Sequence, residues 1–237
     1  MRKLAISTTA IILVILVGIG LYLSVKPIST KTPEVTLPVG GSYNEHTEYY
    51  DIATNYPITT SLTGTANGPA LALIRNFIGQ TIQQFKNSFT AFAQGRKSAL
   101  QITYLIGSSI NTLSYIFTIY ENIGGTHSMF FHTFVFDTTT GQNLSLADLF
   151  RPGAHYLDIL SQISRAELPT VIGIGTTDLA TITSGTKPYE KNFSDFFFDN
   201  NDFVLLFPPY QVASYAAGPQ TLRIPLQKLS SILKSKY

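Results

Sequence analysis

The longest run of hydrophobic positions lies at the N-terminus of the chain. After Arg2 and Lys3, no charged side chain occurs from Leu4 to Val25. At a rise of ~1.5 Å per residue, a helix of this length extends ~33 Å and crosses the ~30 Å hydrocarbon core of a bilayer. The pattern predicts a transmembrane signal-anchor over residues 1–25, with Leu4–Val25 in contact with lipid. The two cations hold the N-terminus in the cytoplasm, so the rest of the chain is expected on the outer side of the cell membrane.

A cleaved signal peptide is the alternative interpretation of this run. Its strongly apolar part is only Ile11–Leu23, a length typical of a signal-peptide core. A small-x-small motif at residues 18–20 lies inside the run and not after it, which favours a retained anchor. Cleavage would give a secreted protein. Both interpretations place the chain from Lys26 onward outside the cytoplasm.

The polar segment that follows predicts a spacer and then a folded domain. Residues 26–42 contain three prolines, a glycine pair and several Ser and Thr side chains, a composition typical of a stiff, solvated linker. Residues 43–237 are then one extracytoplasmic domain, with subregions of about 43–110 and 111–237. A domain of this size can bury a sizeable core.

Helical periodicity is clearest in the first half of this domain. From Pro69 to Phe92, apolar residues recur at steps of three and four, which predicts a long amphipathic helix with proline in its first turn. Shorter helices are expected at His155–Glu167, ended by Pro169, and at Leu226–Leu233. A short helical piece is expected at residues 144–146.

Alternation with a period of two predicts the strands. In Thr112–Glu121 the odd positions are apolar and the even ones mixed, which indicates a sheet packed on one face. Thr126–Asp137, after the Gly124-Gly125 turn, is apolar on both faces, so we expect it at the centre of the sheet. The other strands are expected at residues 47–53, 100–106 and 221–225, and a hairpin at 193–198 and 203–207 with its turn at 199–202.

Charge and composition exclude several classes of function. Without the four cations in or near the anchor, residues 43–237 hold 12 basic and 13 acidic side chains, a net charge of −1. Phosphate binding needs clustered cations, so nucleic acid is not an expected partner. The chain has no cysteine, which removes disulfides, thiolate catalysis, cysteine metal sites and lipoprotein attachment.

Motifs for metal binding or catalysis are absent from the sequence. His127 and His132 are five apart in a predicted strand and therefore point to opposite faces. No H-E-x-x-H or G-x-S-x-G motif occurs. The acidic and amide residues at 195 and 199–202 do not have calcium-loop spacing, which favours a polar hairpin turn. We therefore expect no catalytic residues, no metal and no cofactor.

Two segments carry a resemblance to a known family. Gly124–Ser128 resembles a Gly-Gly-Ala-His signature, and Phe207–Pro219 resembles the more specific C-terminal motif of the DUF3298 family. Residues 46–110 resemble a DUF4163 segment. Such regions form the ectodomains of lysozyme-sensing anti-sigma factors and the non-catalytic N-terminal regions of peptidoglycan deacetylases. The resemblance implies an α+β fold, in which a mixed, mainly antiparallel sheet packs with one long and one or two shorter helices, here preceded by the single transmembrane helix.

Three residues within these segments are candidates for ligand binding. His127 could bind a ligand or relay a proton, although a structural bond from this turn to a backbone carbonyl is the simpler role. Tyr210 and Tyr215 could line a groove for a glycan or protein, or could serve tight packing beside small residues. The sequence leaves both alternatives open.

A non-enzymatic, membrane-tethered binding or sensor domain is the function that these observations favour. Its partner is expected in the cell envelope: peptidoglycan or a muramidase-like protein. Only Met1–Lys3 precede the predicted anchor, so direct binding of a sigma factor is not expected. The alternatives are an enzyme that modifies wall polymers near His127 and an assembly factor of an envelope complex.

Overall fold

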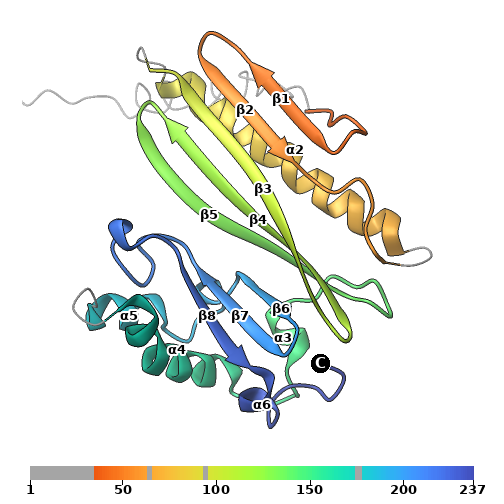
Figure 1. The fold of residues 1–237 in the computed structure, drawn as a ribbon, viewed down its shortest axis with the longest axis vertical. Helices are drawn as coiled ribbons and strands as arrows, with labels where there is room; N and C mark the ends of the chain where they lie inside the picture. The colour runs from red at the N-terminus through yellow and green to blue at the C-terminus, as the bar shows by residue number, and fades with distance from the viewer. Residues whose placement is uncertain (1–34, 63–65, 93–95, 174–177) are drawn as a thin grey trace, which may run out of the picture. The chain divides into compact units, whose positions relative to one another are not determined.

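The computed structural model describes residues 35–237, except for residues 63–65, 93–95 and 174–177 (Figure 1). Val35–Tyr237 forms one compact unit. This unit includes residues 35–42 from the predicted linker, since Leu37 is buried and Arg75 donates a hydrogen bond to the Pro38 carbonyl at 3.1 Å. The predicted anchor lies outside the described residues. Within the described part of the chain, every helix is too short or too polar to span a bilayer.

A five-stranded sheet forms the N-terminal half of the unit. Its strand order follows the sequence, and all neighbours are antiparallel except β2 and β3. Parallel neighbours need a crossover, which the helix α2 (Asn67–Phe92) supplies. Figure 1 shows α2 lying along one face of this sheet. The strands are β1 (Ser42–His46), β2 (Tyr50–Asn55), β3 (Ser98–Ser109), β4 (Thr112–Ile123) and β5 (Thr126–Asp137).

The first hydrophobic core lies between α2 and this sheet. The apolar stripe of α2, including Ile74, Ile78 and Phe85, is fully buried against it. The odd positions of β4, such as Phe117, supply the sheet side of the core, and the even positions of β5 pack beside them. The predicted helix and the burial of the odd positions of β4 are therefore confirmed. The expectation of a sheet packed on one face was wrong, because the even positions Ser114 and Ile116 are buried as well. Gly124 and Gly125, both with positive φ, form the tight turn between β4 and β5.

A three-stranded antiparallel sheet forms the C-terminal half, and it holds a second core with the helix α4 (Tyr156–Ile172). The predicted hairpin is its β6 (Phe196–Asp199) and β7 (Asp202–Phe207), and β8 (Gln220–Pro225) completes it. Short elements surround this sheet: α3 (Leu146–Leu149), α5 (Leu179–Gly185), η2 (Glu190–Asn192), η3 (Tyr215–Ala217) and α6 (Leu226–Leu229). The α+β fold with mainly antiparallel strands is thus confirmed, with two sheets in place of one.

Two expectations about individual elements were wrong. Pro169 does not end α4, which continues to Ile172 and stops at Gly173, where φ is 102°. Pro169 removes one amide donor from the last turn of α4 without ending the helix. β5 is an edge strand of its sheet and not a central one. On its second face Val135 is buried in the core of the other sheet, whereas Met129 and Phe131 are half-buried.

The strand β6 joins the two halves by crossing the face of the five-stranded sheet opposite to α2, where it contacts β3, β4 and β5. The Asn200 amide donates to the Ser108 carbonyl at 2.7 Å, and the Phe196 amide donates to Thr133 Oγ1 at 3.3 Å. A Cβ atom on Gly107 would lie 2.8 Å from both the Phe197 ring and the Phe198 carbonyl oxygen. Glycine at this position therefore permits the close approach.

The buried carboxylate of Asp137 fastens the C-terminal residues to the end of β5. Its Oδ1 accepts hydrogen bonds from the amides of Thr139 and Thr140, both at 2.9 Å. Its Oδ2 accepts from Lys236 Nζ at 2.8 Å and from the Tyr237 hydroxyl at 3.1 Å. Burial alone would raise the pKa of Asp137, but these hydrogen bonds outweigh it and lower the pKa to about 2.

We expect Asp137→Asn to lower the free energy of unfolding by about 1–3 kcal/mol at pH 7, because it removes the charge that Lys236 and Tyr237 bind. The pKa is lower in the folded than in the unfolded state. The contribution of ionised Asp137 to the free energy of unfolding is therefore full above about pH 4, and it decreases as the pH falls toward 2. Urea unfolding of residues 35–237 at pH 2 and at pH 7 measures the loss of stability. The exposed Asp158→Asn is the control, and an equal loss at pH 2 and pH 7 would contradict the expectation.

Asp195 directly precedes β6 and continues its ladder, since its carbonyl accepts from the Leu206 amide at 2.8 Å. By alternation its side chain shares a face with Phe197, toward the five-stranded sheet. Only a long contact of 3.5 Å, from Ser194 Oγ, reaches its carboxyl group among the described residues. Burial without an ionic partner raises the pKa of Asp195 to about 7.

A raised pKa means that Asp195 favours folding when it is protonated. The contribution of protonated Asp195 to the free energy of unfolding is full below about pH 4, and it is lost as the pH rises toward 7. We expect Asp195→Asn, which resembles the protonated form, to be more stable than the unsubstituted chain at pH 8, by about 1–3 kcal/mol. At pH 4 the two should be nearly equal. Urea titrations across this range measure the difference, and a difference independent of pH would refute the assignment.

Candidate functional site

The segment between β7 and β8, residues 208–219, carries two exposed tyrosines, and we call it the tyrosine loop. Tyr210 is 71% exposed and Tyr215, the first residue of η3, is 40% exposed. Their ring centroids lie 5.4 Å apart, with the planes tilted by 34°. The two rings therefore form one exposed aromatic surface in the connection between β7 and β8.

Hydrogen bonds from two glutamine side chains hold this loop at both ends. Gln211 Nε2 donates to the carbonyls of Gly185 at 3.0 Å and Asn192 at 2.9 Å. At the other end, Gln220 Nε2 donates to the carbonyls of Ala217 at 2.8 Å and Gly218 at 3.2 Å. Val212 and Ala213, between the tyrosines, are buried. The loop is therefore anchored by its polar and small residues and not by its aromatic rings.

Tyr210 adopts a backbone conformation that residues other than glycine rarely take. Its φ is 71°, in the left-handed region, which is costly for a bulky residue unless its surroundings enforce it. The anchored Gln211 follows it directly. Gly185 makes that anchor possible, because a Cβ atom there would lie 1.9 Å from the Gln211 carbonyl oxygen. The structure thus fixes an exposed aromatic ring in a strained position.

The tight-packing alternative holds for the loop backbone but not for the tyrosine rings. Residues 211–213 make the packing contacts, while Tyr210 and Tyr215 face outward. Neither ring lines any of the three hollows described below. Their use in ligand binding stays a prediction.

His127 lies apart from these tyrosines, at the hairpin end of β5 in the five-stranded sheet. Its exposed ring bonds through Nδ1 to the Tyr120 hydroxyl and not to a backbone carbonyl. His132 lies on the opposite face, stacked on Phe77 of α2 with ring centroids 4.1 Å apart, and burial lowers its pKa. Among the described residues, Tyr120 is the hydrogen-bond partner of His127 and no second titratable group joins it.

Metal ligands do not gather anywhere in the described part of the chain: no group of three or more His, Asp or Glu side chains is suitably placed. The acidic residues of the β6–β7 turn are instead bound to a cation. Arg223 contacts Asp199 at 2.6 Å and Asp202 at 2.9 Å, as in an ordinary polar hairpin turn.

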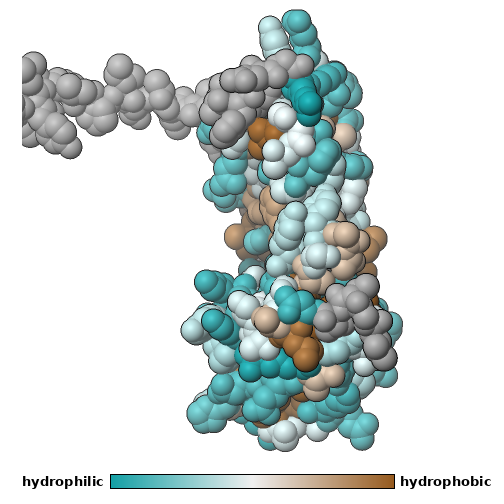
Figure 2. All heavy atoms as spheres, turned by 90° about the vertical axis from the view of Figure 1, so that its left-hand side faces the viewer, coloured by the Kyte–Doolittle hydropathy of each residue, from teal (hydrophilic) through white to brown (hydrophobic). Residues whose placement is uncertain are grey.

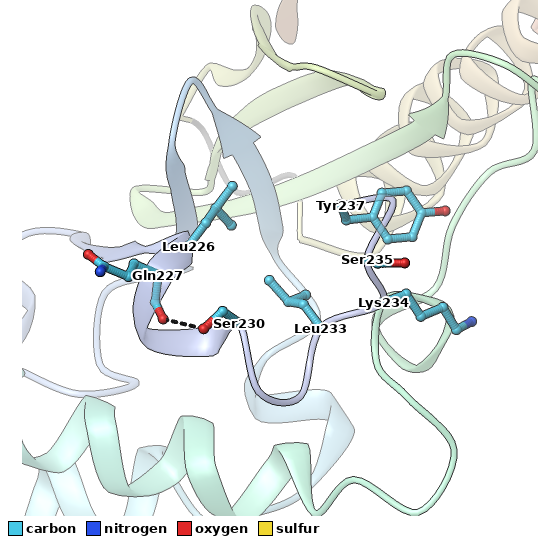
Figure 3. Close-up of a pocket in the computed structure, with 7 residues that line it drawn as sticks. All are labelled: Leu226, Gln227, Ser230, Leu233, Lys234, Ser235 and Tyr237. Carbon is cyan, nitrogen blue, oxygen red and sulfur yellow. Dashed lines mark hydrogen bonds between the residues drawn. The ribbon is translucent and has the colours of Figure 1, made fainter.

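Three shallow hollows occur on the described surface. One, of about 260 Å³, lies between α6 and the C-terminal residues and is lined by leucine, serine, glutamine, lysine and tyrosine side chains (Figure 3). Its Ser230 hydroxyl donates to the Gln227 carbonyl at 2.8 Å. A larger one, of about 460 Å³, shares Leu226 and Tyr237 with it, and the third, of about 230 Å³, surrounds His155. The first two contain neither an acidic nor an imidazole side chain, so they offer little acid–base chemistry.

The segment of residues 185–192 lies next to the tyrosine loop, a position that was not predicted from the sequence. Gln211 holds the carbonyls of its first and last residues. Between them are Lys187, Tyr189 and Lys191, of which Tyr189 is 55% exposed. Nothing in the local pattern indicates this neighbourhood, because a long-range side-chain hydrogen bond creates it.

Comparison with known proteins gives this geometry a family context. Residues 147–227 match the family model described as protein of unknown function, DUF3298. This range contains the tyrosine loop and the segment 185–192. The predicted DUF4163-like segment at 46–110 lies outside it. The peptidoglycan-N-acetylmuramic acid deacetylase PdaC of Bacillus subtilis (strain 168) is 30% identical over 193 residues, which are 79% of this chain and 40% of that protein. The chain thus spans about two fifths of the length of this curated relative.

Solved structures agree with the fold. A DUF3298-family protein from Bacteroides fragilis has a TM-score of 0.54 at 15% identity, covering 82% of this chain and 92% of its own. Another, from Pseudomonas aeruginosa, has a TM-score of 0.52 at 15% identity, covering 85% and 96%. At this identity the likeness concerns the fold alone. Residues 147–227 are therefore similar to DUF3298, in a chain that shares the fold of these solved structures.

Proposed function

We propose that this chain is a non-enzymatic binding protein of the cell envelope, which holds peptidoglycan on its tyrosine loop. In this proposal the N-terminal segment tethers the folded unit outside the cytoplasm. The observation that carries the proposal is the exposed pair of Tyr210 and Tyr215, fixed in a strained and doubly anchored loop.

The geometry of the loop suits a carbohydrate ligand. Tyrosine presents an apolar ring face that can pack against a sugar ring and a hydroxyl that can bond to its polar groups. A loop held in place before binding loses little conformational entropy when a ligand arrives. Backbone strain at an exposed residue is most readily understood where the ring position is used.

The relatives favour peptidoglycan over a muramidase-like protein as the ligand, since the curated relative is by name a deacetylase of peptidoglycan. Binding is favoured over catalysis because the described residues bring no acid or base to His127 other than Tyr120. The proposed tether is tested by whether the whole chain stays with cell membranes after a carbonate wash.

Co-sedimentation of residues 35–237 with purified sacculi tests the proposed binding. This fragment contains all described residues of both cores, so it is expected to fold alone. We expect the double variant Tyr210→Ala and Tyr215→Ala to weaken binding about tenfold or more, since stacked aromatic rings dominate such contacts. Tyr49→Ala removes an exposed ring from the other sheet and should bind normally. Failure of the unsubstituted protein to sediment, or unchanged binding by the double variant, would overturn the proposal.

A second variant tests the same site by changing the contact between Gly185 and Gln211, which holds the tyrosine loop. Gly185→Ala adds a methyl group 1.9 Å from the Gln211 carbonyl oxygen, so the loop must move. We expect weaker sedimentation with sacculi and a loss of about 1–3 kcal/mol in the free energy of unfolding. Gly40→Ala is the matched control, because its added methyl group meets nothing within 4 Å. A folded Gly185→Ala protein that binds normally would show that the loop position is unimportant.

A further inference from the structure

We propose that the carboxylates of the peptidoglycan stem peptides are bound by Lys187 and Lys191, beside the tyrosine loop. This inference rests on the proposed function and names the chemical group that the site recognises. The glycan strands are built from neutral N-acetylated sugars, whereas the stem peptides carry free carboxylates. A site that combines aromatic rings with cations fits such a glycopeptide better than it fits a neutral sugar alone.

The first step of the inference is the position of the two lysines. Gln211 binds the carbonyl of Gly185, two residues before Lys187, and that of Asn192, directly after Lys191. The residue before Gln211 is Tyr210. One side chain therefore holds the lysine-bearing segment against the aromatic loop, and Figure 1 shows α5, which leads into this segment, beside the β7–β8 connection.

The second step is that the cations here lack ionic partners. Most lysines in the described part of the chain are engaged elsewhere: Lys86, Lys97, Lys228 and Lys236 each form an ion pair. Neither Lys187 nor Lys191 does so with any described residue, although both are exposed. Exposed cations without partners bind an incoming anion without first breaking an ion pair.

Neighbouring groups increase the positive character of this surface. Arg165 Nε donates to Thr186 Oγ1 at 3.2 Å, and Arg165 Nη2 donates to the Thr183 carbonyl at 3.3 Å, so neutral acceptors alone occupy its described contacts. The acid in the segment, Glu190, instead accepts from the Tyr156 hydroxyl of α4 at 2.9 Å. Asp158 of α4 lines a hollow together with Pro188, the residue after Lys187. The local balance is thus three cations to two carboxylates, in a domain whose net charge is close to zero.

Tyr189 links the charged and aromatic parts of this surface. Its ring is 55% exposed, and Lys191 Nζ lies 6.0 Å from its centroid. Figure 2 views the molecule from the side on which α5 lies and shows a largely hydrophilic lower part with a small hydrophobic patch. The surface therefore offers three exposed tyrosines together with two free ammonium groups.

Sedimentation of residues 35–237 with three preparations tests the inference: native sacculi stripped of teichoic acid, the same sacculi with carboxylates amidated by carbodiimide and ammonia, and unstripped walls. We expect Lys187→Gln with Lys191→Gln to bind stripped sacculi about 3- to 10-fold more weakly in low salt, since exposed ion pairs are individually weak. Amidation should reduce binding of the unsubstituted protein by a similar factor. High salt should remove most of the difference.

Lys97→Gln with Lys228→Gln is the control, because it changes the net charge equally at distant ion pairs. Equal binding of native and amidated sacculi, or normal binding by the Lys187 and Lys191 variant, would overturn the inference. Binding to unstripped walls that disappears on stripping would also overturn it, in favour of teichoic acid phosphates. The double variant of Tyr210 and Tyr215 separates the two proposals. If this variant fails to bind while the variant of Lys187 and Lys191 binds normally, only the lysine inference is lost. If the unsubstituted protein does not bind, both proposals are lost.

Discussion

The packing of β6 across the five-stranded sheet is the contact on which the two halves of the unit depend. Neither sheet is covered by helices on both faces, and β6 brings their uncovered faces together. Gly107 permits this, since any larger residue would meet the Phe197 ring and the Phe198 carbonyl. Val135 of one sheet consequently belongs to the core of the other. The two halves therefore share apolar burial, and Asp137 adds a polar fastening through the C-terminal residues.

The tyrosine loop lies at one end of the three-stranded sheet, between β7 and β8, and not on the sheet face that α4 covers. The tyrosine loop is held there by hydrogen bonds from Gln211 and by the absence of a side chain at Gly185, and not by burial of its aromatic rings. Many aromatic residues elsewhere in the described part of the chain fill the cores, as Phe117 and Phe203 do. Tyr210 and Tyr215 are distinguished from these by exposure, and Tyr210 also by backbone strain, which supports the proposed binding at this loop.

The family relationship and the site geometry contribute different parts of this conclusion. Similarity to DUF3298 over residues 147–227 and to the solved structures establishes the fold but no activity, since one fold hosts many functions. The deacetylase relative directs attention to the cell wall, although the chain spans only about two fifths of its length. The proposal of binding rather than catalysis rests on the residues themselves: an anchored aromatic pair with two lysines beside it that form no ion pair with a described residue, and a histidine whose described partner is a tyrosine.

The sequence by itself determined the elements whose signals are local. The three- and four-residue steps of α2, the alternation in β4, the Gly124-Gly125 turn and the β6–β7 hairpin were all predictable, because each depends on residues close in the chain. The motif around Tyr210 and Tyr215 falls in the loop between β7 and β8, and its use in ligand binding stays a prediction. Periodicity indicates that a face of a strand is buried but not which element buries it. The strand β5 was therefore expected at the centre of its sheet, whereas it lies at the edge. Only the tertiary structure decided that the tyrosine rings point outward and that Lys187 and Lys191 lie beside them, since a long-range bond from Gln211 creates that neighbourhood.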